Sequence, residues 1–434
     1  AKGIKGFDYE KAFEASKASA MRDVLGLDAY KKNGFISIDD EHESVSKTLE
    51  YAYDDWCIAQ MAQILNKQED YQYFMKRSQN WKNIFDWETG FMRPKKNGGW
   101  DKPFDPREVN NNFTEGNSWQ YSFFVPQDIH GMIEAYGGPE KFEAKLDEMF
   151  NSESKTTGRE QVDVTGLIGQ YAHGNEPSHH MAYLYNYVGK PEKTNEKVKY
   201  ILDNFYTNAP DGLIGNEDCG QMSAWYVLSS MGIYQVTPGQ TVFNTVKPIF
   251  SSAKIKLESK ELITISDLEN RIPFVYFDLK QNMFPETIIS FNPDIIVPVI
   301  ESESKSFINK QLISIKSKIN VEYDEIYYFV DYDFNKNIDS NTEFIKYTNP
   351  FEIDKSAKVY AFSNFQIRGM YRSNVPKKFI KSNTISATFF KKPNNYSINI
   401  KSVYNPQYHA GGPEGLLDGI LGNENWRKGD WQGY

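Results

Sequence analysis

The chain of 434 residues gathers carboxylates, histidines and amides in three glycine-containing loops that could carry out acid–base chemistry. The first loop, residues 111–121, places Glu115 beside Gly116 and shortly before Trp119. This arrangement fits a carboxylate exposed on a turn. The alternative is that Glu115 belongs to the capped first turn of a helix, where the helix dipole stabilises a negative charge. The residues by themselves leave both interpretations open.

The second loop, residues 173–180, contains half of the six histidines of the chain, namely His173, His179 and His180. Together with Asn175 and Glu176, they could bind a metal, recognise sugar hydroxyls or transfer protons. The spacing differs from the His-Glu-x-x-His zinc motif, and amide and carboxylate oxygens suit calcium better than zinc. The alternative is a polar connection between helices that is capped by a serine.

The third loop, residues 211–225, has three acidic residues and three glycines ahead of a predicted helix. Glycine lets the backbone approach a ligand closely. Asp218 in this loop could be a general base, a metal ligand or a helix cap. A further acidic pair, Asp54 and Asp55, falls inside a predicted helix, where adjacent side chains point about 100° apart and one of them faces inward. That inward residue could face a pocket or pack between helices.

Taken together, these acids suit the hydrolysis of a glycoside. This reaction needs an acid for the leaving oxygen and a second carboxylate, held about 6.5–9.5 Å apart when the configuration is inverted. The candidate carboxylates Glu115, Glu176 and Asp218 lie far apart in the sequence. Loops that join successive helices of a toroid can nevertheless converge at one end of it.

The elements that must position these loops are predicted from periodicity. Residues 49–64 repeat apolar side chains at helical spacing. Further helices are predicted at 2–20, 71–81, 142–150, 181–188, 196–205 and 222–231, which indicates an all-α toroid or bundle up to residue 240. Beyond it, alternating β-branched residues predict strands at 253–257, 261–265, 288–291 and 295–300, and short strands over 327–382.

Bulk composition excludes several classes of protein. The net charge of −9 and the lack of long basic runs argue against nucleic acid as a partner. No apolar run approaches the roughly 18 residues of a membrane span. The two cysteines, Cys57 and Cys219, have no metal-like spacing, and we predict free thiols in the core. Aromatic residues make up 15% of the chain, and they could serve sugar faces or core packing equally well.

Several segments in order resemble the calcium-dependent α-mannosidases of glycoside hydrolase family 92. They are residues 2–8, 43–56, 90–94, 114–121 (Thr-Glu-Gly-Asn-Ser-Trp-Gln-Tyr), 174–180 (Gly-Asn-Glu-Pro-Ser-His-His) and 215–225 (Gly-Asn-Glu-Asp-Cys-Gly-Gln-Met-Ser-Ala-Trp). The resemblance implies an (α/α)6 barrel, exo-cleavage of α-mannosides in mannose-rich glycans, inversion and a catalytic Ca²⁺ that engages the mannose hydroxyls.

The resemblance also implies residue roles. Glu115 is expected to be the general acid, and a Glu rather than a Gln favours an ordinary α-mannosidase over one that cleaves mannose-phosphate linkages. Asp218 is the expected base, although Asn216 stands where some members have Asp. The expected metal ligands are Asn175, Glu176 and Asp218, and the expected substrate-binding residues are Trp119, His173, Glu176, His179, His180 and Asn216. We predict α-1,2 specificity; the alternative is a catalytically inactive carbohydrate-binding protein on the same scaffold.

The predicted fold class is multidomain α plus β, a partial (α/α)6 barrel followed by β-sandwich-type modules. Residues 1–240 are predicted to be the barrel without its N-terminal part, and a missing N-terminal β-sandwich is expected to pack on it, so we hypothesise that this chain alone is inactive. Residues 241–310 are β-rich without an assignment. Residues 311–382 resemble the hexosaminidase C-terminal module, and 383–434 resemble the start of a truncated discoidin-type domain. The expected location is extracytoplasmic: periplasmic, cell-surface or secreted.

Overall fold

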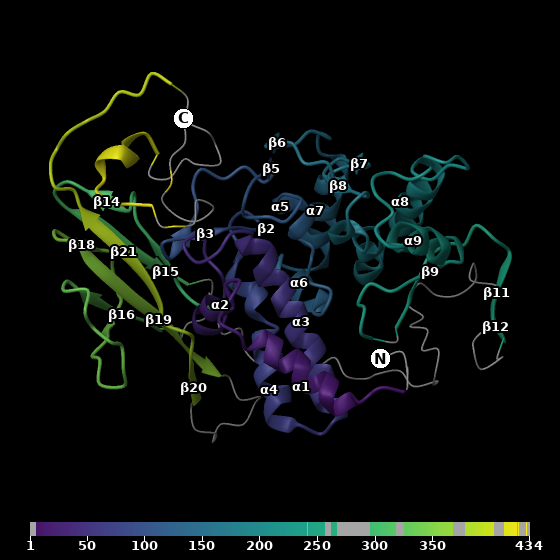
Figure 1. Cartoon of the computed structure of the whole chain (residues 1–434), viewed down its shortest axis with the longest axis horizontal. Helices are drawn as coiled ribbons and strands as arrows, with labels where there is room; N and C mark the ends of the chain where they lie inside the picture. Colours follow the sequence, from purple (N-terminus) through teal and green to yellow (C-terminus); the bar gives the residue numbers. More distant parts are fainter. Residues whose placement is uncertain are drawn as a thin grey trace. The chain divides into compact units, whose positions relative to one another are not determined.

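The computed structural model describes residues 6–240, 242–256, 262–266, 296–317, 325–367, 378–402, 412–422, 424 and 431 (Figure 1). The chain forms two compact units. The first, here the site unit, comprises residues 1–9, 106–109 and 115–289; the second, here the sheet unit, comprises 10–105, 110–114 and 290–434. The first candidate loop belongs to the site unit from Glu115 onward, and the second and third loops belong to it entirely. No described helix is both long and apolar enough to cross a membrane.

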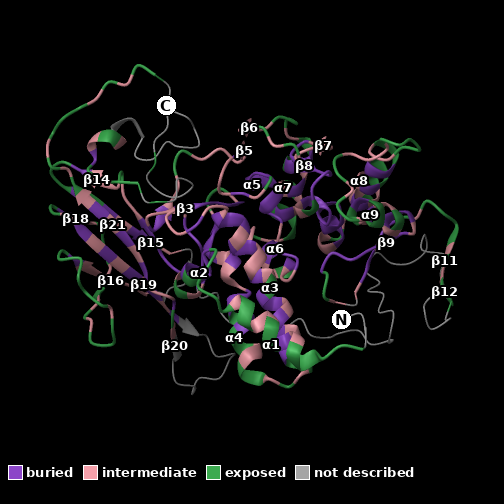
Figure 2. Ribbon diagram, viewed as in Figure 1, coloured by how far each residue is buried: buried purple, intermediate pink, exposed green. Residues whose placement is uncertain are grey.

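The helical part of the sheet unit is built around an apolar cluster. Phe13, Trp56, Ala59 and Phe74 are among its buried members. The helices that supply this region are α1 (Tyr9–Ala20), α2 (Leu27–Asn33), α3 (Ser44–Ile64) and α4 (Gln68–Arg77), followed by the 3₁₀ turn η1 (Asn80–Asn83). The predicted helix at 49–64 is confirmed, whereas the prediction at 71–81 corresponds to α4 and η1 rather than to one helix. Figure 2 shows much of α1 and α4 exposed.

The inward acid of the predicted pair is Asp55, and it packs between helices. Asp55 is buried in α3, where its Oδ2 accepts hydrogen bonds from Arg77 Nε at 2.8 Å and from Tyr30 Oη at 3.1 Å. Asp54 is exposed. Burial raises the pKa of Asp55 to about 7, although the Arg77 charge opposes this shift. The structure therefore supports the packing interpretation of this pair.

The described strands of the sheet unit from residue 299 onward form one large sheet and one smaller sheet. The large sheet has the order β14 (Ser306–Phe307), β21 (Ile385–Lys391), β19 (Ala357–Ile367), β16 (Glu325–Asp331) and β17 (Ile345–Lys346), and β20 (Lys378–Lys381) also pairs with β19. The smaller sheet has the order β13 (Val299–Glu301), β15 (Gln311–Lys316) and β18 (Phe351–Ile353). Of these pairs only β14–β21 is parallel.

The core of the large sheet follows the period-2 pattern of its strands. Val359 lies opposite Ala387, and both are buried. Because β21 pairs with β19, this sheet continues past residue 382, where the sequence predicted the discoidin-type segment to begin. The assignments of 311–382 and 383–434 to known modules stay predictions. The sheet unit also holds β1 (Phe85–Asp86), β2 (Phe91–Met92), β3 (Lys95–Lys96), β4 (Gly99–Trp100) and the 3₁₀ turn η6 (Gly412–Leu417).

The site unit combines helices with short strand pairs. Its helices are α5 (Ser118–Tyr121), α6 (Ile129–Ala135), α7 (Pro139–Asn151), α8 (Pro191–Asn204) and α9 (Gln221–Ser230). Its strands are β5 (Glu108–Val109), β6 (Thr157–Gly158), β7 (Leu167–Ile168), β8 (Tyr171–Ala172), β9 (Ile233–Tyr234), β10 (Asn244–Thr245), β11 (Ser252–Lys256) and β12 (Leu262–Ser266). The β11–β12 pair matches the strands predicted at 253–257 and 261–265. The strand predicted at 288–291 lies outside the described residues.

Two sequence-based expectations about the site unit need adjustment. Residues 181–188 form the 3₁₀ helix η3 (Met181–Val188) rather than an α-helix. Its first six residues are all buried, so it lacks the polar face of an amphipathic helix, and it ends at Gly189 in the left-handed conformation. The mixed helix and sheet content replaces the expected all-α region, because short strand pairs connect the helices. The (α/α)6 barrel itself stays a prediction.

Candidate active site

The first loop is organised by Asn117, which caps α5. Asn117 Oδ1 accepts a hydrogen bond from Trp119 N at 2.9 Å, while Asn117 N donates to Gln120 Oε1 at 2.8 Å, so the two side chains form a capping box. Glu115 precedes the cap, is exposed, and has a φ of +52°. The interpretation of Glu115 as a residue of the first helical turn is therefore wrong, and it is a turn carboxylate.

The indole of Trp119, in this loop, is buried. Only 3% of Trp119 is exposed, and Lys145 Nζ lies 4.7 Å from the centre of its ring. The ring thus contributes to the packing of α5 on α7. Its expected contact with substrate stays a prediction.

The three histidines of the second loop are buried and hydrogen-bonded inside the protein. His173 Nδ1 lies 2.8 Å from Tyr171 Oη, and its Nε2 lies 2.7 Å from Tyr206 Oη. His179 Nε2 contacts the His173 carbonyl at 2.9 Å. His180 Nε2 contacts the carbonyl of Phe123 at 2.8 Å.

Burial determines the charge state of the histidines. Burial lowers the pKa of His173 to about 2 and the pKa values of His179 and His180 to about 4. The rings are therefore neutral near pH 7, and the bonds of His173 and His179 hold the backbone of the loop in place. Their predicted role in binding substrate is untested.

Asn175 and Glu176 connect the second loop to the first. Asn175 Nδ2 donates to the carbonyl of Glu115 at 3.0 Å, and Asn175 Oδ1 accepts from Glu176 N at 3.1 Å as the cap of the 3₁₀ turn η2 (Glu176–Ser178). The side chain of Glu176 is exposed. A direct hydrogen bond therefore fixes Glu115 relative to the loop that carries the Glu176 carboxylate.

In the third loop, the side chain of Glu217 rather than that of Asp218 bonds to the start of α9. The Glu217 carboxylate accepts hydrogen bonds from Gly220 N and from Ser223 N, the latter at 3.1 Å. The Ser223 side chain and these backbone bonds lower the pKa of Glu217. Asp218 is exposed, has a φ of +54°, and contributes its carbonyl, which accepts from Gln221 N at 3.1 Å. The interpretation of Asp218 as a side-chain cap is therefore not supported.

The structure adds Asp163, a carboxylate that sequence reasoning missed. Asp163 Oδ1 accepts a hydrogen bond from Asn216 Nδ2 at 3.3 Å, across 53 residues of sequence. The only local signal was an acid three residues before Gly166, in a stretch with no predicted element. Periodicity could not have connected this residue to the third loop.

Three other carboxylates act on Glu115 in the site unit. Partial burial raises the pKa of Glu115, and the negative charges of Asp163, Glu176 and Asp218 raise it further, whereas the Asn175 amide acts in the opposite direction. A carboxyl group that keeps its proton above the usual range is suited to general-acid catalysis. The expected acid and base, Glu115 and Asp218, are therefore brought into electrostatic contact.

The predicted donor set consists of the kind of ligands that calcium prefers. Asn175, Glu176 and Asp218 supply an amide and two carboxylates, which are the oxygen donors that Ca²⁺ prefers. Within the part of the chain that the structure describes, no three His, Cys, Asp or Glu side chains lie close enough to hold a metal ion. The chemistry of the donors fits calcium, and the ligand set stays a prediction.

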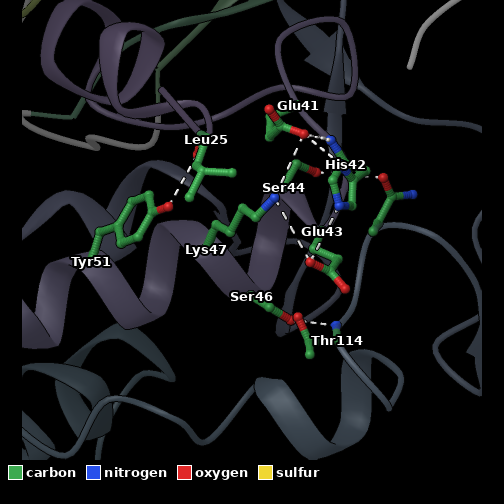
Figure 3. Close-up of polar contacts among 10 residues, drawn as sticks. Leu25, Glu41, His42, Glu43, Ser44, Ser46, Lys47, Tyr51 and Thr114 are labelled. Atoms are coloured by element: carbon green, nitrogen blue, oxygen red, sulfur yellow. Dashed lines mark hydrogen bonds and ion pairs between the residues drawn. The ribbon is translucent and has the colours of Figure 1, made fainter. Parts of the chain in front are cut away.

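A polar network in the sheet unit fixes the chain just before Glu115 (Figure 3). At the start of α3, Glu43 N donates to Asn111 O at 2.6 Å and Ser46 Oγ accepts from Thr114 N at 2.8 Å. Lys47 Nζ lies 3.6 Å from Glu41 and 3.7 Å from Glu43. The bond of Glu43 N, together with that of Val45 N to Asn112 O at 3.1 Å, satisfies N–H groups at the start of α3, which has no side-chain cap. The bond to Ser46 Oγ holds Thr114, the residue next to Glu115.

Comparison with known proteins places these loops in a family. Residues 1–284 match the glycosyl hydrolase family 92 catalytic domain. The chain belongs to this family. An uncharacterized secreted glycosidase of Arthroderma benhamiae is 29% identical over 263 residues, which are 53% of this chain and 32% of that protein.

Solved family 92 structures are also similar. An α-mannosidase of Bacteroides thetaiotaomicron in complex with mannoimidazole is 43% identical with a TM-score of 0.57, covering 60% of this chain and 36% of its own. A family 92 inverting mannosidase of Bacteroides thetaiotaomicron VPI-5482 is 35% identical with a TM-score of 0.55, covering 62% and 39%. The chain thus spans about a third of the length of these relatives. The expected family is confirmed.

Proposed function

We propose that this chain carries the acid and the base of an exo-acting, inverting α-mannosidase that removes terminal mannose from mannose-rich glycans. The linkage that we propose for its substrate is α-1,2. The observation that carries the proposal is the raised pKa of Glu115 among the charges of Asp163, Glu176 and Asp218. Similarity to family 92 mannosidases supports the substrate class and the inverting outcome. The proposed architecture of residues 1–240 is part of an (α/α)6 barrel.

In the proposed reaction, Glu115 and Asp218 act on opposite sides of the scissile bond. Glu115 gives its proton to the glycosidic oxygen as the bond from this oxygen to the anomeric carbon breaks. Asp218 takes a proton from the water that attacks the anomeric carbon from the other face. The products are a free mannose of inverted configuration and the shortened glycan. Asn175, by bonding to the Glu115 carbonyl, orients the acid loop.

Calcium dependence belongs to the same proposal. Asn175, Glu176 and Asp218 would hold the ion, and Ca²⁺ bound there would engage mannose hydroxyls and favour a distorted sugar ring. The remaining proposed sugar contacts are Trp119, His173, Glu176, His179, His180 and Asn216. The relative named a secreted glycosidase supports an extracytoplasmic location. The second candidate, a carbohydrate-binding protein without catalysis, predicts sugar binding with no turnover.

The test is a comparison of Glu115→Gln with the unsubstituted protein on α-1,2-mannobiose and on an activated aryl α-mannoside. Loss of a general acid is expected to lower kcat/KM on mannobiose by about 10²–10⁴-fold. The loss on the aryl mannoside is expected to be smaller, because its leaving group needs less protonation. Glu160→Gln, an exposed acid on another loop, is the matched control. Equal rates of the variant and the unsubstituted protein on mannobiose would show that Glu115 is not the acid. Sugar binding without turnover in the unsubstituted protein would favour the second candidate.

A further inference from the structure

Residues 163–166 (Asp-Val-Thr-Gly), here called the spacer segment, join the second and third loops of the site unit. On one side, Gly174 N donates to Thr165 O at 3.1 Å and His173 N donates to Gly166 O at 3.1 Å. On the other side, Asp163 Oδ1 accepts from Asn216 Nδ2 at 3.3 Å. The segment is thus hydrogen-bonded to both loops at once.

These bonds continue to the proposed acid. The second loop is bonded in turn to Glu115, because Asn175 Nδ2 donates to the Glu115 carbonyl at 3.0 Å. A path of short contacts therefore runs from Asn216, two residues before Asp218, through the spacer segment to Glu115.

Close packing also lets the spacer segment set the distance between the second and third loops. A Cβ on Gly174 would lie 1.9 Å from Thr165 Oγ1, and a Cβ on Gly215 would lie 2.8 Å from that same oxygen. Thr165 therefore stands directly between the two loops, and only glycine fits against it on either side. Thr165 Oγ1 is buried and makes no hydrogen bond in the described structure, so it acts there by its size.

We propose that the spacer segment fixes the separation between the loops of Glu115 and Asp218, with Asp163 and Thr165 as positioning residues. The inference rests on the roles proposed above for Glu115 and Asp218. An inverting enzyme must keep its two carboxyl groups about 6.5–9.5 Å apart so that a water fits beside the sugar. A spacer anchored by hydrogen bonds and by contact on both sides meets that requirement.

Two substitutions of Asp163 test its hydrogen bond to Asn216. Asp163→Asn keeps an oxygen that can accept this bond, whereas Asp163→Ala removes it. Amide exchange of residues 212–220, measured by mass spectrometry, is expected to speed up several-fold only in Asp163→Ala. Glu160→Gln should leave this exchange unchanged.

Two substitutions of Thr165 test the spacing. Thr165→Val has nearly the same shape and should retain kcat and the exchange rate of residues 212–220. Thr165→Ala leaves space beside Gly174 and Gly215, and it should speed exchange in 212–220 and lower kcat, by up to about 10²-fold for a displacement near 1 Å. Equal behaviour of the Val and Ala variants would overturn the spacing role.

The exchange measurement keeps this inference separate from the proposed function. If neither this chain nor a longer form of the protein hydrolyses a mannoside, the proposed function fails, and exchange in Asp163→Ala and Thr165→Ala still decides whether the spacer segment orders the third loop. Exchange that stays unchanged in both Ala variants would overturn the inference, whatever the activity.

Discussion

Replacing Arg77 by Met should destabilise the helical part of the sheet unit by an amount that grows with pH. Arg77 lies at the end of α4 with 6% of its surface exposed, and its guanidinium pairs with buried Asp55 of α3 at 2.8 Å. Arg77 Nη2 also donates to the carbonyl of Ala20 at 3.2 Å. The substitution preserves most of the apolar stem and removes the charge together with these bonds.

The magnitude depends on whether Asp55 is ionised. The pKa of Asp55 is raised to about 7 by burial, so at pH 6 the carboxyl is mostly protonated in the folded protein. There the cost should be that of the lost hydrogen bonds, about 1–3 kcal/mol. Above pH 7 the carboxylate would be buried without its cation, and the cost should approach about 3–5 kcal/mol.

The sign follows from proton linkage. A carboxyl whose folded pKa exceeds its unfolded value binds more protons when folded, so stability falls as pH rises between the two values. Loss of Arg77 raises the folded pKa of Asp55 further, since the guanidinium lowers it now. The variant should therefore keep losing stability above pH 7, by up to about 1.4 kcal/mol per pH unit. The free energy of unfolding of the unsubstituted protein levels off at a lower pH.

Urea denaturation followed by circular dichroism at pH 6 and pH 8.5 measures this difference. The control is Lys17→Met, which breaks a surface ion pair with Asp70 of 2.7 Å and should cost at most about 1 kcal/mol at either pH. A cost of Arg77→Met that is equal at both pH values, or smaller at pH 8.5, would refute the reasoning.

Three further outcomes are expected. Phe74→Ala, at a fully buried position, should lower the free energy of unfolding by about 3–5 kcal/mol, whereas Ile64→Ala, at a site 71% exposed, should change it by less than about 0.5 kcal/mol; similar urea midpoints would contradict this. Gly174→Ala should lower both activity and the melting temperature because of the 1.9 Å contact with Thr165, and adding Thr165→Ala should restore part of the melting temperature. Removing calcium with a chelator should abolish mannoside hydrolysis, CaCl₂ should restore it, and full activity in the chelator would count against the calcium proposal.

The sequence determined the features that depend on nearby residues. The helical period of residues 49–64 predicted most of α3, because burying one face of a helix requires apolar side chains at that spacing. The alternation of 253–257 and 261–265 predicted β11 and β12 for the equivalent reason. The loop motifs were also local, and they identified the family together with Glu115 and Asp218 as candidates.

Tertiary structure alone decided how these candidates are used. It selected the side chain of Glu217 over that of Asp218 at the start of α9, and it placed Glu115 before Asn117, the cap of α5, rather than in the first turn. Burial made the three clustered histidines neutral, and burial depends on the packing of residues that are distant in the sequence. Asp163 became part of the site through Asn216, 53 residues away. Desolvation and charge interactions depend on separation in space, which a pattern along the chain does not encode.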